Sequence, residues 1–184
     1  ARTLGDGLRK LPTDEQVEEQ VREHLAIFHA DTQPRELALL RQTALLWMTR
    51  LQAWRPHLGG AAWRGTATTR SVLRIELYAD DPKLAQFALL DLGITDHAPE
   101  APGHQRGEAV MSKTVRVQGL DEPVLIDFIV LDTDALRGGL KPDARGHTWR
   151  GDLRGLRELM ARELTAREST PVESPSQQGE RDGA

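Results

Sequence analysis

The chain of 184 residues contains no cysteine. This absence excludes disulfide bonds, thiolate zinc sites, iron–sulfur clusters and a cysteine nucleophile, and it fits a reducing compartment. Long hydrophobic runs are also missing, because no stretch approaches the ~18 apolar residues that a membrane-spanning helix requires. No signal-peptide pattern opens the sequence. We therefore expect a cytoplasmic protein without a membrane partner.

Aromatic residues are few, at 4% of the chain, and neither sign of charge dominates: 24 basic and 28 acidic residues give a formal net charge of −4. With 39% hydrophobic residues, this composition is typical of one globular domain. Basic residues outnumber acidic ones by eight to four within residues 137–167, but Trp149 is the single aromatic residue among them. We expect this segment to pair with the acidic part of its own domain rather than with nucleic acid.

Two helices are predicted near the N-terminus. The run Pro12 to Gln16 carries a capping box that begins the first helix. Its apolar residues recur at steps of four and three and predict a stripe that packs against the core, formed by Val17, Val21, Leu25 and Phe28. The charged residues between them are expected to face water: Glu18, Glu19, Arg22 and Glu23. The second helix is predicted from about Pro34 to Trp54, before Arg55-Pro56 ends it.

Alternating apolar residues later in the chain predict strands. Leu73, Ile75 and Leu77 alternate with polar residues, and Asp81-Pro82 then begins a helix that Gly93 ends. A short strand is expected at 94–98, a surface loop at 99–107, a hairpin of strands at 110–117 and 124–131, and a last helix capped by Asp152. This order predicts an α+β domain with a mixed sheet, in which the helix after Asp81 is long enough to return the chain to a parallel neighbour.

The domain itself is predicted to span residues 13–167. Residues 1–12 are expected to be a truncated or processed helical lead-in, broken at Gly5 and Gly7. Residues 168–184 are rich in Ser, Pro, Gln, Gly and Glu, a composition that buries too little apolar surface to offset ordering, so we expect a disordered tail.

Small, basic and acidic residues occur in an order that suggests phosphate chemistry. Gly65-Thr66 follows the short apolar segment 61–63, which we interpret as a strand, and small residues let backbone amides approach a phosphate. Basic residues that could contact a phosphate surround the pair, at Arg64, Arg70 and Arg74. Glu76 lies on the next predicted strand and Asp127 on a later one, and converging carboxylates are what a divalent cation requires.

This arrangement resembles the nucleotidyltransferase superfamily, which has a hydrophobic residue, glycine, and serine or glycine, then an Asp-hydrophobic-Asp/Glu pair on the neighbouring strand and a third carboxylate later. The resemblance implies that Gly65 and Thr66 contact nucleotide phosphates, and that Glu76 and Asp127 are catalytic carboxylates that bind Mg²⁺. Arg74 stands where the superfamily has its first aspartate, and seven residues, fewer than usual, separate it from Thr66. A cation there repels a metal ion, so we expect impaired or non-standard transfer.

The chain also resembles a family of small proteobacterial proteins that commonly carry a nucleotidyltransferase label or the name UDP-N-acetylmuramate–alanine ligase. The matching residues are Leu11-Pro12, Gly65-Thr66-Ala67, the run 71–83, Gly93-Ile94 and Pro123-Val124. This resemblance implies a bacterial protein with a degenerate site. The ligase name does not fit the sequence, because such an enzyme needs a Gly-rich phosphate loop with a lysine and several hundred residues.

Each candidate residue also has a purely structural interpretation. Gly65-Thr66 can be an ordinary turn, the three arginines can be a solvated strand face, and Asp127 can face either solvent or a cleft. The first hypothesis is recognition of a nucleotide or phosphate ligand with little standard transfer. The second is an active transferase with an atypical metal site, and the third is a non-enzymatic interaction module that uses the apolar faces of the two N-terminal helices. The oligomeric state is left open.

Overall fold

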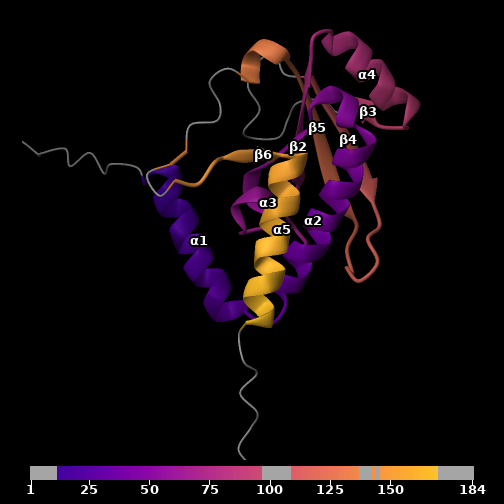
Figure 1. The fold of residues 1–184 in the computed structure, drawn as a ribbon. Helices are drawn as coiled ribbons and strands as arrows, with labels where there is room; N and C mark the ends of the chain where they lie inside the picture. Colours follow the sequence, from indigo (N-terminus) through magenta and orange to yellow (C-terminus); the bar gives the residue numbers. More distant parts are fainter. Residues whose placement is uncertain (1–11, 97–108, 137–141, 144–145, 170–184) are drawn as a thin grey trace, which may run out of the picture.

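The computed structural model describes residues 12–96, 109–136, 142–143 and 146–169 (Figure 1). Its α-helices are α1 (Asp14–Phe28), α2 (Gln33–Arg50), α3 (Gly60–Arg64), α4 (Pro82–Asp91) and α5 (Leu153–Glu168). Its strands are β1 (His57–Gly59), β2 (Leu73–Ala79), β3 (Thr95–Asp96), β4 (Ala109–Val115), β5 (Val124–Asp132) and β6 (Arg150–Asp152). Two short 3-10 helices are η1 (Gln52–Trp54) and η2 (Thr133–Leu136).

The strands form one mixed sheet in the order β3-β4-β5-β2-β1-β6. The central strands β2 and β5 run parallel, and the other neighbouring pairs run antiparallel. The helix α4 and the β3–β4 pair provide the long connection that a parallel neighbour requires. The predicted α+β class, the hairpin of β4 with β5 and the parallel return after α4 are confirmed.

The two faces of the sheet differ in character because side chains alternate along each strand. On β2, Leu73, Ile75 and Leu77 are fully buried in a core to which α2, α4 and α5 all contribute. Each such leucine or isoleucine contributes about 1.5–3 kcal/mol to stability. The even-numbered side chains of β2, beginning with Arg74 and Glu76, therefore lie on the opposite face.

Local signals fix the ends of the helices as predicted. Thr13 and Gln16 form both bonds of a capping box at α1. The side chain of Asp81 accepts from the first turn of α4, and that of Asp152 accepts from the Gly155 amide at the start of α5. The predicted second helix is divided, because α2 ends at Arg50 and η1 completes the segment.

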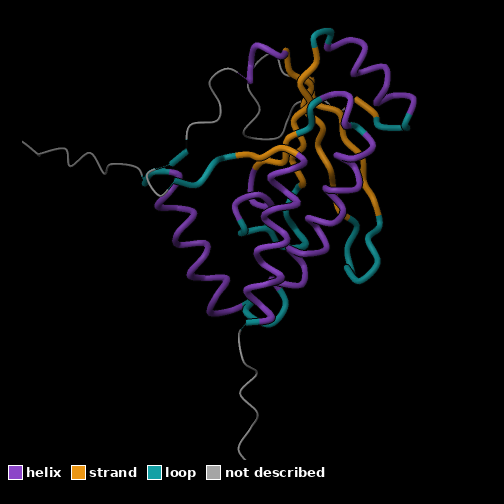
Figure 2. Tube along the Cα trace, in the orientation of Figure 1, coloured by secondary structure: helices purple, strands orange, loops and turns teal. Residues whose placement is uncertain are grey.

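Helix α1 stands apart from α2 and α5, which lie side by side (Figure 2). Of the predicted apolar stripe, Leu25 alone is buried, whereas three members are exposed: Val17, Val21 and Phe28. The side chains partly buried against the body are polar, namely Glu18, Glu19 and Arg22. The expectation that the apolar stripe packs on the core was therefore wrong for most of its residues. It was also wrong to group α2 with α1 as an open surface, since the apolar face of α2 is in the core.

Two short strands were missed, and one strand was predicted where a helix lies. Residues 61–63 belong to α3, so Gly65 and Thr66 follow a helix rather than a strand. Strands β1 and β6 have three residues each, too few to show an alternating pattern. The expected lead-in helix at 1–11, the loop at 99–107 and the tail from 170 lie outside the described residues, while α5 continues to Glu168.

Candidate functional site

A buried polar cluster lies on the sheet face opposite the helices, and Glu76 is at its centre. Its carboxylate is almost completely buried, with 7% of the residue exposed. Arg150 of β6 donates from Nη1 to Oε2 at 2.7 Å, and the Tyr78 hydroxyl donates to the same oxygen at 2.5 Å. Arg74 approaches the other oxygen, Oε1, with its Nε at 3.4 Å. Both oxygens of Glu76 are thus engaged by protein donors.

Burial favours the neutral forms of the two aromatic members of the cluster, Tyr78 and His57. Burial, and then the hydrogen bond to Glu76, raises the pKa of the Tyr78 hydroxyl far above its usual value. The His57 ring meets the Tyr78 ring edge-on, with centroids 5.1 Å apart. Burial lowers the pKa of His57, and the nearby Arg150 charge adds to this effect. Its Nδ1 lies 2.9 Å from the Arg55 carbonyl, which accepts a hydrogen bond from the Nδ1–H of the ring.

Asp127 lies on the same sheet face as Glu76. It is the β5 register partner of Arg74 on β2, and paired residues of neighbouring strands point to the same side. Ser112, its partner on β4, donates its hydroxyl to Asp127 Oδ1 at 2.6 Å. The sequence left open whether Asp127 faces solvent or a cleft, and the structure buries it.

The two predicted carboxylates therefore share a face, but their surroundings do not suit a metal ion. Arg74 on β2 is the register partner of Asp127 on β5, and it is the neighbour of Glu76 on the same face of β2. Its positive charge therefore lies where a metal ion bound by both carboxylates would have to be, and it would repel that ion. Within the described part of the chain, no group of three or more His, Asp or Glu residues is arranged to hold a metal ion. Octahedral Mg²⁺ needs oxygen ligands that are not already bound by guanidinium groups.

The glycine turn nearest to Glu76 is Gly59-Gly60, not Gly65-Thr66. A Cβ placed on Gly59 would lie 3.7 Å from Glu76 Oε1, so the strand passes directly over the carboxylate. Gly60 begins α3 with φ +64°, a conformation that favours glycine. Gly65 lies at the other end of α3, where its carbonyl accepts a hydrogen bond from Gln33 of α2. The structure does not bring Gly65 or Thr66 to the carboxylates.

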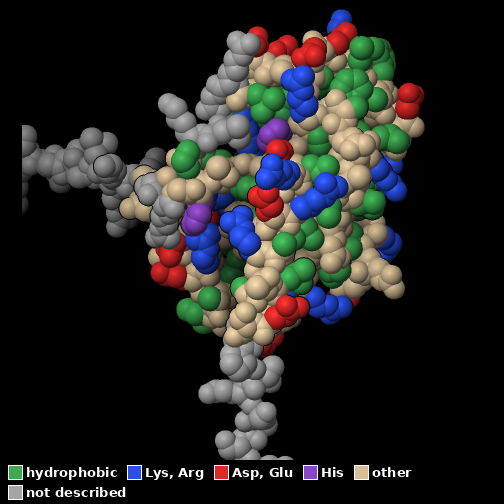
Figure 3. All heavy atoms as spheres, in the orientation of Figure 1, with side chains coloured by type: hydrophobic (Ala, Val, Ile, Leu, Met, Phe, Trp, Pro, Cys, Tyr) green, Lys and Arg blue, Asp and Glu red, His purple; other side chains and the backbone are tan. Residues whose placement is uncertain are grey.

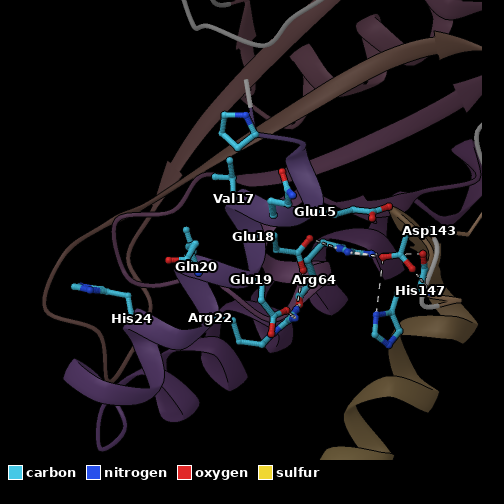
Figure 4. Close-up of a pocket in the computed structure, with 13 residues that line it drawn as sticks. Glu15, Val17, Glu18, Glu19, Gln20, Arg22, His24, Arg64, Asp143 and His147 are labelled. Atoms are coloured by element: carbon cyan, nitrogen blue, oxygen red, sulfur yellow. Dashed lines mark hydrogen bonds and ion pairs between the residues drawn. The ribbon is translucent and has the colours of Figure 1, made fainter. Parts of the chain in front are cut away.

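Arg64 is a structural cation between three segments (Figure 4). Its Nε binds Glu18 of α1 at 2.7 Å and its Nη2 binds Asp143 at 2.7 Å, while the guanidinium stacks on Trp149. Burial alone would lower the pKa of Arg64, but the hydrogen bonds to Glu18 and Asp143 raise it. Arg64 lines a cavity of about 760 Å³ beside α1 that Glu76 and Asp127 do not line. Arg70, the remaining predicted phosphate contact, is exposed in the turn before β2.

Sequence reasoning found Glu76, Asp127 and Arg74 but missed Arg150, which joins the cluster from 74 residues further along the chain. It placed Gly65-Thr66 beside the carboxylates, whereas Gly59 is the glycine that lies near Glu76 in the structure. The sequence carried a signal for this difference, because only seven residues separate Thr66 from Arg74, fewer than in the pattern that the chain resembles, while thirteen separate Gly60 from Arg74. No comparable signal in the sequence points to Arg150.

No protein-family model matches the sequence, and a search of curated proteins gives no match. Of the helices that the structure describes, none combines the length and the apolar character needed to cross a membrane.

Proposed function

We propose that this chain is a nucleotidyltransferase-like domain that recognises a nucleotide or another phosphate-bearing ligand and does not carry out standard metal-dependent transfer. The observation that carries the proposal is the hydrogen bonding of the Glu76 carboxylate. Its two oxygens accept from Arg150, Tyr78 and Arg74. A carboxylate bound in this way is not available to Mg²⁺, so the proposal gives the metal no role at this residue.

The topology supports the resemblance to the superfamily. Strand β1 ends in Leu58-Gly59, Gly60 follows it as the first residue of α3, and β1 runs antiparallel to the strand that carries Arg74-Ile75-Glu76. That strand runs parallel to a later one that carries Asp127. The three elements of the superfamily pattern therefore occur in the expected order, with arginine in place of the first aspartate.

One partly exposed guanidinium in the cluster supports an anionic ligand. Arg74 and Arg150 both pair with Glu76, and Asp127 lies beside Arg74 on the same face, so the positive and negative charges of the cluster are balanced. The proposal therefore depends on Arg74 itself. Arg74 has about a third of its side chain exposed, so a ligand at the Gly60 turn can reach it. A guanidinium group recognises phosphate through two parallel hydrogen bonds, and a glycine turn lets backbone amides approach the same group.

Binding of nucleoside triphosphates tests the proposal. We would follow thermal unfolding and calorimetric binding of the four common ribonucleoside triphosphates, each with Mg²⁺ and with a chelator. The expected result is stabilisation by at least one triphosphate that persists in the chelator. Arg74→Gln should weaken this binding about tenfold or more, since it removes a charge-assisted phosphate contact.

A matched control is Arg154→Gln, which removes an exposed arginine that also pairs with a glutamate but lies on α5. It should leave binding unchanged. Failure of every triphosphate to stabilise the chain would refute ligand recognition. Stabilisation that requires Mg²⁺, and that Glu76→Gln and Asp127→Asn both abolish, would instead favour an active transferase with an atypical metal site.

A further inference from the structure

Helix α4 exposes an apolar stripe to solvent. Its inner side is buried through Ala85 and Leu89, but the outer side carries large apolar residues that are 42–62% exposed: Leu84, Phe87, Leu90 and Leu92. Figure 3 shows hydrophobic side chains gathered over the α4 end of the molecule. A helix that is apolar on both sides is normally buried on both sides, and large exposed apolar patches mark interaction sites.

The sequence that follows α4 and β3 has little apolar character with which to cover the stripe. Residues 97–108, which follow α4 and β3, contain no Leu, Ile, Val, Met, Phe, Trp or Tyr. Their composition therefore offers no large apolar side chain to fill the spaces between Leu84, Phe87 and Leu90. The stripe needs an occupant with large apolar side chains of its own.

We infer that the outer face of α4 is the interface between two copies of this chain, packed antiparallel with Phe87 at the twofold axis. Apolar residues lie at equal distances before and after Phe87 along α4, so the outer face of the helix can pack against a second copy of itself. Leu84 and Leu90 lie three positions before and after it, so an antiparallel partner brings Leu84 of one copy level with Leu90 of the other. A twofold interface requires this kind of match between a surface and itself.

The charges follow the same symmetry. Lys83 and Asp91 are the charged residues of α4, four positions before and after Phe87, and both are exposed. In the described part of the chain neither forms an ion pair. Antiparallel packing brings Lys83 of one copy level with Asp91 of the other at both ends of the interface, which favours this register over parallel packing.

The other exposed apolar face, on α1, does not have this property. Exposed acidic residues on α1 would repel a second α1: Asp14, Glu15 and Glu23. Charge therefore selects α4 rather than α1 as the face that meets a second copy. Because α4 has ten residues and spans only about 15 Å, it supplies the apolar centre of a small interface, and we expect a dissociation constant in the micromolar range.

Sedimentation velocity of the full chain over a wide range of concentrations tests the inference. The wild type should pass from monomer to dimer as concentration rises. Phe87→Glu should be monomeric throughout, since it places two charges at the axis, and its native circular dichroism would show that the fold is intact. The matched control is Phe28→Glu on α1, which alters an aromatic side chain of similar exposure and should leave the dimer unchanged.

Charge reversal tests the register. Lys83→Glu and Asp91→Lys should each raise the dissociation constant about tenfold, and the double variant should restore wild-type affinity. A wild type that stays monomeric at every concentration overturns the inference. A dimer that Phe28→Glu abolishes and Phe87→Glu does not would overturn it in favour of α1, and a double variant without recovery would overturn the antiparallel register.

Discussion

Arg150 reaches across strand β1 to bind Glu76, with 2.7 Å between Nη1 and Oε2. The two residues lie on strands that flank β1, where Gly59 is the register partner of Arg150 and of Arg74, and His57 is the partner of Glu76. A Cβ placed on Gly59 would lie 3.7 Å from Glu76 Oε1 and 3.8 Å from the Cβ of Arg150, so this glycine lies against both members of the pair. The glycine and the ion pair are thus parts of one arrangement that ties β6 to the centre of the sheet.

The Glu76–Arg150 pair should contribute strongly and cooperatively to stability. Glu76→Gln and Arg150→Met should each lower the free energy of unfolding by about 3–5 kcal/mol, because each removes one charge of a largely buried ion pair and leaves the other without its closest ionic contact. The double variant should lose clearly less than the sum of the two. Urea unfolding of the three variants and the wild type gives the coupling energy.

The exposed pair Arg154–Glu158 on α5 provides the comparison. The same cycle there should give a coupling within about 0.5 kcal/mol of zero, since exposed pairs i and i+4 on a helix contribute little. Strictly additive losses at Glu76 and Arg150 would mean that the contact between them is not energetically significant.

The parts of the fold that depend on local chemistry were predictable from the sequence. Thr13, Asp81 and Asp152 cap helices through bonds to amides two or three residues away, so a short window of sequence contains the whole signal. The alternation in β2 likewise predicted a strand, although the structure buries nearly all of its side chains on both faces. The short strands β1 and β6 could not be found in this way, because three residues carry no period and their pairing is a property of the assembled sheet.

The orientation of α1 shows the limit of periodicity. A helical stripe identifies an apolar face but not what that face meets, and α1 is attached through Glu18 to the buried guanidinium of Arg64. The candidate site was predictable to the same degree. The strand pattern located Glu76 and Asp127, while the role of Arg150 depends on β6 lying beside β1, which nothing near residue 150 indicates.

Removal of the Arg64 side chain should loosen the attachment of α1 to the body. The Arg64 side chain forms the ion pair with Glu18 that joins α1 to α3, and Arg64→Ala removes it. The bond from Arg22 to the backbone carbonyl at this position and the packing of the buried Leu25 remain, so we expect faster local opening rather than loss of the helix. In Arg64→Ala, amides of α1 should exchange with solvent about tenfold faster or more, while those of β2 keep their protection. Hydrogen exchange followed by mass spectrometry resolves the two segments.

Arg70→Ala is the control for Arg64, because Arg70 is exposed and six residues away. It should leave exchange in α1 at the wild-type rate. Equal protection of α1 in Arg64→Ala and the wild type would show that Glu18 and Asp143 do not hold the helix through this cation.

A side chain at position 151 should not fit against Trp63. A Cβ built on Gly151 would lie 1.9 Å from Cη2 of the indole ring, and the ring is fixed by a hydrogen bond from its Nε1 to the Thr148 carbonyl. Gly151→Ala should therefore lower the free energy of unfolding by about 1–3 kcal/mol, as overpacking does in well-packed cores. Urea unfolding measures the loss.

A second variant changes the indole ring of Trp63. Trp63→Phe removes the ring atoms that the new Cβ would strike, so it should cost less in the Gly151→Ala background than in the wild type. A cost that is equal in both backgrounds would mean that the clash is relieved by movement of β6 rather than borne by Trp63.

The buried His57 should make stability fall as the solution is acidified below neutral. Burial, and then the Arg150 charge, lowers its pKa in the folded chain below the ordinary value of 6.5. As pH falls through 6.5 toward that lowered pKa, the unfolded chain gains a proton at His57 that the folded chain does not. Acid therefore favours unfolding in this window, and stability returns as pH rises above it.

Urea unfolding at pH 7.5 and at pH 5.5 should show this loss of stability in the wild type. His57→Gln should reduce the loss, while His24→Gln on the exposed face of α1 should not, and an undiminished loss in His57→Gln would assign the effect to other groups.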